Sequence, residues 1–252
     1  MIKVLLNGCL GKMGKVITEC AKNYEDIKIT GGIDKSIPDF DPGYTVFTDI
    51  NKCTDDYDVL LDFSRPESLD DLINYCKGKK IPLILCTTGY TKTQLCNIQQ
   101  MSKIIPIFRS ANMSIGINII NNILKEFTKK LYSDFDIEII DKHHNQKVDS
   151  PSGTALLLGD TIKDCIPEQT EYVYGREGSS KRAKSEIGMH SLRGGTIVGE
   201  HEVIFAGKGE TIEIKHTAIS REVFAVGAIK ACDFMANKAP GLYSMDDIIN
   251  CK

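Results

Sequence analysis

The chain has 252 residues, of which 42% are hydrophobic and 26% charged, so it can bury a full core and is neither fibrous nor wholly disordered. Its 31 Lys and Arg residues against 34 Asp and Glu residues give a formal net charge of -3, which predicts no general binding to nucleic acid or to an anionic membrane. Nine cysteines without any Cys-x-x-Cys pair predict free thiols in a reducing compartment rather than a disulfide framework or a zinc site.

The apolar segments are short. The run Ile2–Leu6 is too short for a signal peptide, and no later stretch approaches the ~18 uninterrupted apolar residues of a membrane span. We therefore expect a cytoplasmic protein without a membrane partner.

The first half of the chain alternates apolar runs with amphipathic stretches. Ile2–Leu6 is a strand candidate, followed by a glycine turn and a helical pattern that continues to Ala21. The same alternation continues with strands at 27–33, 59–63, 81–86 and 104–108 and with helices at 66–76 and 91–101. This order predicts an α/β fold with a mostly parallel sheet that helices cover on both faces.

The pattern changes after about residue 112. A long helix is expected at 115–132 and a half-buried strand at 135–141, and further along a helix at 155–162 and strands at 197–205 and 211–218. Consecutive strands predict a second, α+β domain with a mixed or antiparallel sheet. The polar, turn-rich segment 167–188 is interpreted as a mobile loop, and a last helix is expected at 223–237.

Three glycines lie between the first predicted strand and the first predicted helix. Gly8, Gly11 and Gly14 have the spacing G-x-x-G-x-x-G, and Asp34 follows the second strand 20 residues after Gly14. A tight turn alone would also use glycines. The strand before them, the helix after them and the acid, which can accept a hydrogen bond from a ribose hydroxyl, favour a Rossmann-like site for a nicotinamide dinucleotide.

Other polar residues are expected near the same ligand. Lys12 and Lys35 are either solvated surface charges or contacts to a 2′-phosphate, so NADH and NADPH both stay open. Segments 86–89 and 110–113 follow predicted strands, and their Thr and Asn side chains can bind the nicotinamide ribose or amide, although they are also ordinary turn residues. Cys9 and Cys86 have no visible base beside them and are interpreted as small apolar side chains.

The densest cluster of reactive side chains lies at 141–155. His143, His144 and Lys147 lie just before a Ser-Gly-Thr sequence that opens a helix, so proton donors adjoin backbone amides of Gly153 and Thr154 that can bind a carboxylate. The alternative is a simple helix cap with exposed histidines. Adjacent histidines point apart and no usual ligand set completes them, so no metal site is predicted. The histidines at 190, 201 and 216 are interpreted as structural.

These segments resemble the dihydrodipicolinate reductases (4-hydroxy-tetrahydrodipicolinate reductases) of bacterial lysine and diaminopimelate synthesis. The resemblance rests on segments 8–14, 87–89, 111–118, 143–155 and 193–201, which together span essentially the whole chain. Its most specific part is His-His-x-x-Lys-x-Asp-x-Pro-Ser-Gly-Thr-Ala, which begins at His143.

The resemblance implies a homotetrameric oxidoreductase. Such an enzyme uses NADH or NADPH to reduce the cyclic dicarboxylate imine formed from aspartate semialdehyde and pyruvate, giving tetrahydrodipicolinate. The resemblance also implies a dinucleotide-binding domain of residues 1–114 and 223–252 and a substrate-binding and oligomerisation domain of residues 115–222.

The resemblance further implies roles for individual residues. His143 is the proton donor or acceptor and Lys147 the proton donor, while His144, Gly153 and Thr154 bind the substrate. Cofactor contacts fall on Gly8, Cys9, Leu10, Gly11, Lys12, Met13, Asp34, Lys35, Cys86, Thr87, Thr88, Ser110, Ala111, Asn112 and Met113.

The chain departs from the family pattern at three places. Cys86 replaces the usual Gly and Met113 a common aromatic residue, so those contacts depend on backbone atoms and shape. Asp34-Lys35 replaces a Glu-Arg pair, and because Lys lacks the bidentate fork of Arg, a preference for NADPH is not implied.

Two alternatives are weighed against this interpretation. Another two-domain oxidoreductase, such as an amino-acid or sugar dehydrogenase, would share the first domain, but the cluster at 143–155 argues against it. A silent NADH-sensing regulator is disfavoured because His143 and Lys147 are both present.

Overall fold

The computed structural model describes residues 1–251, which form two compact units. Unit 1 comprises Met1–Ile115 and the chain from Arg221 onward, and unit 2 comprises Gly116–Ser220. Within the described part of the chain no helix is both long and apolar enough to cross a membrane. All nine cysteines are free.

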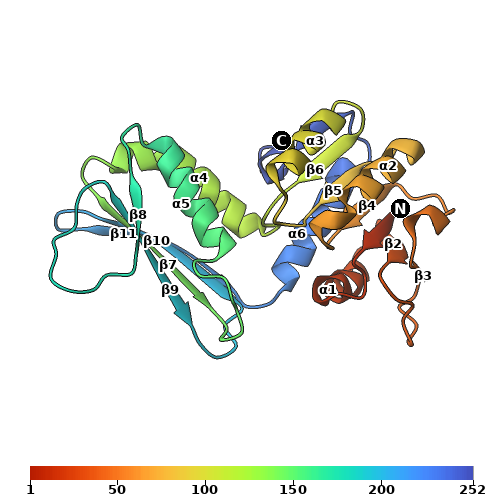
Figure 1. The fold of residues 1–252 in the computed structure, drawn as a ribbon, viewed down its shortest axis with the longest axis horizontal. Helices are drawn as coiled ribbons and strands as arrows, with labels where there is room; N and C mark the ends of the chain where they lie inside the picture. Colours follow the sequence, from red (N-terminus) through yellow and green to blue (C-terminus); the bar gives the residue numbers. More distant parts are fainter. Residues whose placement is uncertain (252) are drawn as a thin grey trace. The chain divides into compact units, whose positions relative to one another are not determined.

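Unit 1 contains a parallel sheet with the strand order β12-β6-β5-β4-β1-β2-β3 (Figure 1). Its strands are β1 (Ile2–Asn7), β2 (Ile27–Ile33), β3 (Thr45–Phe47), β4 (Val59–Asp62), β5 (Leu83–Leu85), β6 (Pro106–Arg109) and β12 (Gly241–Tyr243). The order reverses between β1 and β4, and open sheets of this kind bind ligands beyond the carboxyl ends of the strands at such a reversal.

Helices cover both faces of this sheet. The helices α1 (Lys12–Ala21), α6 (Glu222–Met235) and α7 (Met245–Ile249) pack on the face that presents Leu6, Leu61 and Phe108. The other face is covered by α2 (Leu69–Lys79) and α3 (Lys92–Met101). Of two short 3-10 helices, η1 (Ile50–Lys52) comes before β4 in the chain, and η2 (Pro66–Ser68) directly precedes α2. Burial on both faces explains why the central strands are almost wholly apolar.

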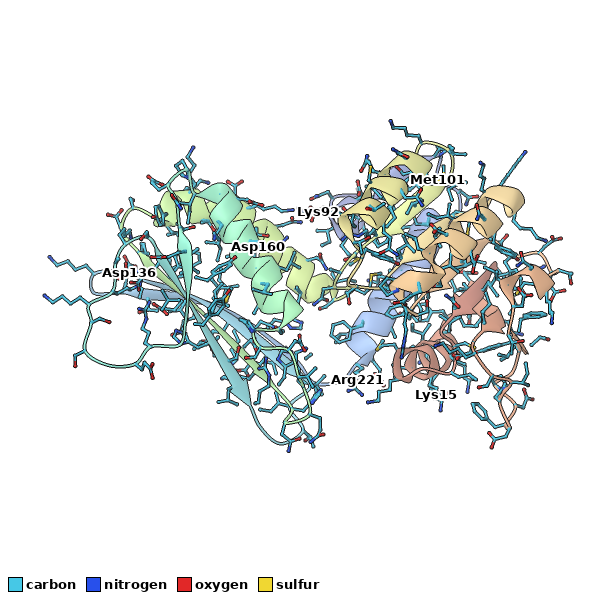
Figure 2. The ribbon with its side chains drawn as sticks, in the orientation of Figure 1. Lys15, Lys92, Met101, Asp136, Asp160 and Arg221 are labelled. Atoms are coloured by element: carbon cyan, nitrogen blue, oxygen red, sulfur yellow. The ribbon has the colours of Figure 1, made fainter. Side chains whose placement is uncertain are left out.

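Unit 2 is a mixed five-stranded sheet with helices on one face. Its strands, in the order β11-β10-β7-β9-β8, are β7 (Asp136–His143), β8 (Glu171–Tyr174), β9 (Glu186–Arg193), β10 (Gly199–Ala206) and β11 (Thr211–Ala218). The helices α4 (Ile115–Leu131) and α5 (Gly153–Cys165) pack through Leu124 and Leu158 on Ile139 and Phe205. In Figure 2, Asp160 marks the helical layer and Asp136 the start of β7.

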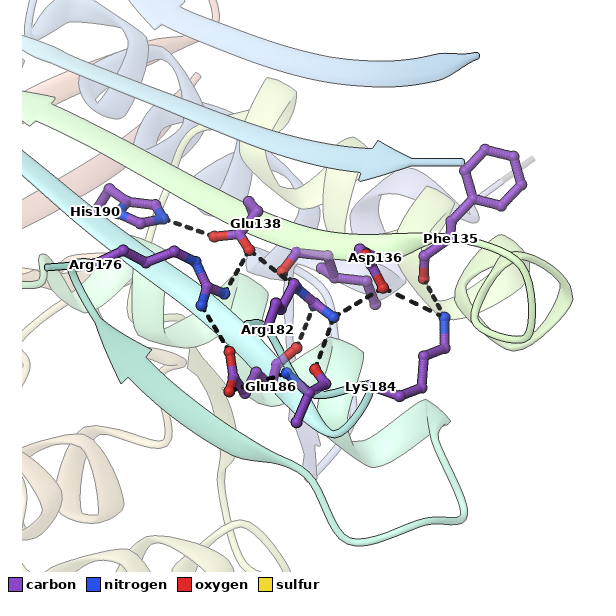
Figure 3. Close-up of polar contacts among 10 residues, drawn as sticks. Phe135, Asp136, Glu138, Arg176, Arg182, Lys184, Glu186 and His190 are labelled. Carbon is purple, nitrogen blue, oxygen red and sulfur yellow. Dashed lines mark hydrogen bonds and ion pairs between the residues drawn. The ribbon is translucent and has the colours of Figure 1, made fainter. Parts of the chain in front are cut away.

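The opposite face of β7 carries an ion-pair cluster (Figure 3). Glu138 accepts hydrogen bonds from Arg176 Nη2 at 2.6 Å, Arg182 Nε at 3.1 Å and His190 Nε2 at 2.6 Å. Arg182 also bonds Asp136 at 2.8 Å. These contacts tie the segment after β8 to the sheet.

The predicted fold class is confirmed, and the structure adds several elements. The parallel sheet with helices on both faces and the second, mixed sheet are both present. The prediction of a loop throughout 167–188 is wrong for Glu171–Tyr174, which pair with β9 as β8, and for residues 186–188, which begin β9. The short strands β3 and β12, the strand β9 and the helix α7 were not predicted either.

Candidate active site

The glycine loop connects β1 to α1, and its glycines have different structural requirements. Gly8 has a φ of +79°, and a Cβ there would lie 2.6 Å from the Phe63 carbonyl oxygen. A Cβ at Gly14 would lie 2.3 Å from the Gly8 carbonyl oxygen. A Cβ at Gly11 meets only that same oxygen, at 3.2 Å. The fold therefore requires the first and last glycines, while the space at Gly11 is open to a ligand.

The N-terminus of α1 fits a phosphate group. Gly11 is the N-cap, no side chain caps the helix, and the first turn holds no acidic residue. Its amides and the positive end of the helix dipole therefore suit an anion. Asp34, at the end of β2, accepts a hydrogen bond from the Leu10 amide at 2.8 Å, which fixes the loop and leaves lone pairs for a ribose hydroxyl. Lys12 and Lys35 are both exposed.

A buried carboxylate joins the ends of three neighbouring strands. Asp62, fully buried at the end of β4, accepts from Asn7 Nδ2 at 2.8 Å and from Thr87 Oγ1 at 2.7 Å. Ser64 Oγ donates to the same carboxylate at 2.6 Å. Burial raises the pKa of Asp62, and these hydrogen bonds oppose the rise. Sequence reasoning missed Asp62, although an acid directly after the apolar run 59–61 was a visible signal.

The segments after β5 and β6 lie at the same edge of the sheet. Thr87 is buried against Asp62, whereas Thr88 is exposed. Ser110 Oγ donates to the Asn112 carbonyl oxygen at 2.7 Å and Ala111 is exposed. Met113 lies in the core and packs closely on α6. A Cβ at Gly227 of that helix would lie only 1.8 Å from the Met113 carbonyl oxygen.

The two thiols near the loop are not activated. Cys9 and Cys86 are both buried. Burial, with the charge of Asp34 as a smaller cause, raises the pKa of Cys9 to about 11. Burial also raises the pKa of Cys86. Both side chains are therefore neutral near pH 7, as their interpretation as apolar side chains predicts.

In unit 2 the core face of β7 changes from apolar to polar along the strand. Ile137, Ile139, Asp141 and His143 are buried on one face, since alternate residues of a strand share a face. Strand pairing places Ser191 and His201 opposite Asp141 and places Arg193 opposite His143. The carboxyl end of β7 thus carries a polar cluster directly beyond the core.

Asp141 is the centre of this cluster and is 1% exposed. It accepts hydrogen bonds from Arg193 Nη1 at 2.5 Å, the Ser152 amide at 2.7 Å, Ser191 Oγ at 3.1 Å and His143 Nδ1 at 3.2 Å. Burial by itself would raise the pKa of Asp141, but the hydrogen bonds, led by that from Arg193, hold it below its usual value. The carboxylate is therefore ionised at neutral pH.

His143 and Lys147 have different surroundings. His143 is buried, and burial lowers its pKa while Asp141 opposes the shift. Lys147 Nζ lies 2.7 Å from Asp149 Oδ1, with 22% of the lysine side chain exposed. His144 is half-buried beside them. Lys147 thus offers a cation near solvent, and His143 an imidazole that is uncharged near pH 7.

The N-terminus of α5 completes the site. Ser152 is the N-cap, and its Oγ accepts from the Ala155 amide at 3.1 Å and lies 2.9 Å from His201 Nε2. Gly153 is exposed, and among residues 1–251 a Cβ built on it meets no atom within 4 Å outside its chain neighbours and its own helix backbone, so space is open in front of the helix. Thr154 is half-buried in the first turn. Amides at this end favour a carboxylate ligand.

Three residues of the cluster were not predicted as functional. His201, interpreted as structural, has its ring centroid 5.1 Å from that of His143. The sequence places Asp141 and Arg193 in the segments 141–155 and 193–201 but gives neither of them a role. Among residues 1–251, no group of three His, Cys, Asp or Glu side chains is placed to hold a metal ion.

The sheet order and the uncapped glycine loop are typical of oxidoreductases that use a nicotinamide cofactor, and the polar cluster at the end of β7 lies in a second unit. Two family models match the chain, "Dihydrodipicolinate reductase, N-terminus" over residues 2–113 and "Dihydrodipicolinate reductase, C-terminus" over residues 116–249. The chain belongs to the dihydrodipicolinate reductase family.

Individual relatives agree with this assignment. The chain is 63% identical over 250 residues to a 4-hydroxy-tetrahydrodipicolinate reductase of Clostridium tetani, covering 99% of this chain and 98% of the relative. It is 61% identical over 252 residues to that of Clostridium novyi, covering 100% of both. A dipicolinate-bound dihydrodipicolinate reductase from Paenisporosarcina sp. TG-14 has a similar fold, with a TM-score of 0.81 at 22% identity and 97% coverage of both chains.

Proposed function

We propose that this chain catalyses the NADH- or NADPH-dependent reduction of 4-hydroxy-tetrahydrodipicolinate to tetrahydrodipicolinate in lysine and diaminopimelate synthesis. The observation that carries the proposal is the polar cluster at the carboxyl end of β7, in a chain of the dihydrodipicolinate reductase family. A substrate with two carboxylates needs cationic side chains and free helix-end amides, and this cluster offers both.

The dinucleotide is assigned to the domain of residues 1–114 and 223–252. Its phosphates would contact the loop from Gly8 to Met13, and its adenosine ribose would contact Asp34. Thr87, Thr88 and the segment 110–113 would hold the nicotinamide side, where a bound reduced nicotinamide supplies the hydride. The uncapped start of α1 and the open space at Gly11 support this assignment.

The substrate is assigned to the domain of residues 115–222. The amides of Gly153 and Thr154 would bind one carboxylate, with His144 as a further contact. The open space that the described residues leave around Gly153 supports an approach of the ligand to the backbone there.

Lys147 and His143 are assigned the proton chemistry. Reduction of the imine leaves negative charge on the substrate, and a cation such as Lys147 stabilises that charge and supplies a proton. Lys147 pairs with the half-exposed Asp149 carboxylate, at 2.7 Å. If a substrate carboxylate replaces Asp149 as the partner of Lys147, the number of ion pairs stays the same.

The substitution Lys147→Ala tests this assignment. We expect turnover to fall by roughly 100- to 10,000-fold, the usual contribution of positioned general-acid catalysis. Affinity for NADH should stay within about twofold, since the dinucleotide is assigned to the other domain. Turnover and NADH binding are measured separately, by the nicotinamide absorbance and by fluorescence titration.

Lys142→Ala is the matched control. Lys142 precedes His143 on β7 but lies on the opposite face of the strand, where it pairs with Glu200. Its loss should leave turnover nearly unchanged. Equal losses in both variants, or a large loss of NADH affinity in Lys147→Ala, would contradict the role of Lys147.

We also propose that the protein is a homotetramer that acts in the cytoplasm. The open face of the unit 2 sheet supports assembly, because half-buried Ile140 and Ile204 lie on it among charged residues. Light scattering coupled to size exclusion should give four times the mass of the chain; a monomer would contradict the proposal.

A further inference from the structure

We propose that Asp141 is a positioning residue of the reductase site, which fixes both the tautomer of His143 and the start of α5. This inference rests on the proposed function, and it explains what holds the His143 imidazole in place.

The carboxylate divides its two oxygens between two parts of the site. Oδ1 accepts from His143 Nδ1 at 3.2 Å and Arg193 Nη1 at 2.5 Å. Oδ2 accepts from the Ser152 amide at 2.7 Å and Ser191 Oγ at 3.1 Å. Asp141 itself is 1% exposed, so its carboxylate has little access to water as a substitute partner. One buried group therefore connects β7, β9 and the N-cap of α5.

The hydrogen-bond chemistry of this carboxylate fixes the imidazole. An ionised carboxylate can only accept hydrogen bonds, so His143 Nδ1 must carry the proton in the bond to Asp141. In the neutral ring Nε2 then has a lone pair and no proton. A Cβ at Gly199 would lie 3.2 Å from Nε2, so the glycine on β10 leaves that nitrogen unobstructed on this side.

This tautomer separates the roles of the two proposed proton-transfer residues. Neutral His143 can accept a proton or a hydrogen bond at Nε2 but cannot donate from that atom. Lys147, a cation with three donors, remains the group that gives the proton. The sequence alone left His143 as either donor or acceptor.

The same carboxylate also sets the carboxylate-binding end of α5. Its bond to the Ser152 amide fixes the peptide that immediately precedes Gly153 and Thr154. A shift of Asp141 would therefore displace the imidazole and the helix-end amides together. Misplacement of reacting groups by about 1 Å can cost about 100-fold in rate.

Several charged or titratable groups act on His143 and determine its pH response. Asp141 lies on β7, the same strand as His143, and Lys147 lies on the loop that follows β7. Arg193 lies on β9 and His201 on β10. Of these four neighbours only Asp141 favours the protonated ring. Its removal should therefore shift the acid limb of the kcat/KM profile to lower pH.

The first test is nitrogen NMR of the His143 ring in the unmodified protein, where a neutral ring protonated at Nδ1 is expected. A neutral ring protonated at Nε2 would overturn the proposal without any variant having to fold. In Asp141→Asn the amide can donate as well as accept, so we expect the tautomer to change and kcat to fall about 100-fold. NADH affinity should not change.

Two variants separate positioning from general stability. Asp141→Glu keeps the charge and should restore the Nδ1-protonated ring and part of kcat. Glu138→Gln removes another multiply bonded acid of β7 (Figure 3). Because Glu138 lies on the opposite face of that strand, this variant should lower stability but leave the His143 tautomer and kcat unchanged. An Asp141→Asn enzyme with normal kcat and an unchanged tautomer would refute the inference.

Failure of the positioning role and failure of the proposed function give different results. If the unmodified protein has no reductase activity but His143 has the expected tautomer, the proposed function fails while the structural role of Asp141 stands. If the enzyme is active and insensitive to Asp141→Asn, only the positioning role fails.

Discussion

His201 should make unit 2 sensitive to acid. Its imidazole is 5% exposed, and its Nδ1 is buried without a hydrogen-bond partner among the described residues. Burial is the main cause that lowers the pKa of His201 to about 4 from an ordinary 6.5, with a further contribution from the charge of His143. Asp141 opposes the shift without reversing it.

The size of the effect follows from proton linkage. Between pH 6.5 and about 4 the unfolded chain binds a proton at His201 that the folded chain does not. Stability therefore falls as the pH drops through this window, and below about pH 4 there is no further loss from this group. The difference between the two pKa values corresponds to about 3 kcal/mol.

The substitution His201→Gln tests this reasoning by removing the titrating group. The free energy of unfolding is measured in urea for the wild type and the variant at about pH 7 and about pH 4. The loss on acidification should be about 3 kcal/mol smaller in the variant, whatever its stability at neutral pH. If the wild type and the variant lose the same free energy of unfolding on acidification, burial of His201 does not carry this cost.

Three further substitutions test unit 1. Gly14→Ala places a Cβ 2.3 Å from the Gly8 carbonyl oxygen, so we expect a loss of about 1–3 kcal/mol of stability together with weaker NADH binding. Gly11→Ala meets only a contact at 3.2 Å and should keep the thermal midpoint within a few degrees while weakening NADH binding about tenfold or more. Calorimetry and NADH titration check both, and a reversed order of stability would contradict the description of the loop. Asp62→Asn leaves a buried donor such as the Thr87 hydroxyl without its acceptor, for a loss of about 1–3 kcal/mol in urea unfolding; an unchanged midpoint would argue against the role of Asp62 in joining the strand ends.

The elements that could be predicted from the sequence are those with a local signal. The apolar runs at 27–33 and 211–218 agree with β2 and β11 at both ends. The missed strands depend on partners far away in the chain. In β9, Glu186 and His190 interrupt the apolar pattern because they face the Glu138 cluster, and β8 exists only through its pairing with β9.

The candidate site shows the same division. His143, Lys147, Gly153 and Thr154 lie within one short segment, so their association is visible in the sequence. The contacts of Asp141 with residues 191 and 193 follow from strand register, over about fifty positions of the chain. No local pattern specifies that register, so the sequence alone does not reveal that residues 191 and 193 contact Asp141.

The most direct test of the central claim is a coupled assay of the purified protein. The preceding synthase generates the substrate from aspartate semialdehyde and pyruvate, and the oxidation of NADH and of NADPH is followed at the nicotinamide absorbance. We expect substrate-dependent oxidation that Lys147→Ala nearly abolishes, and the ratio of the two rates gives the coenzyme preference. A protein that binds the dinucleotide but shows no substrate-dependent oxidation would contradict the proposed reaction and favour a sensor or a different substrate.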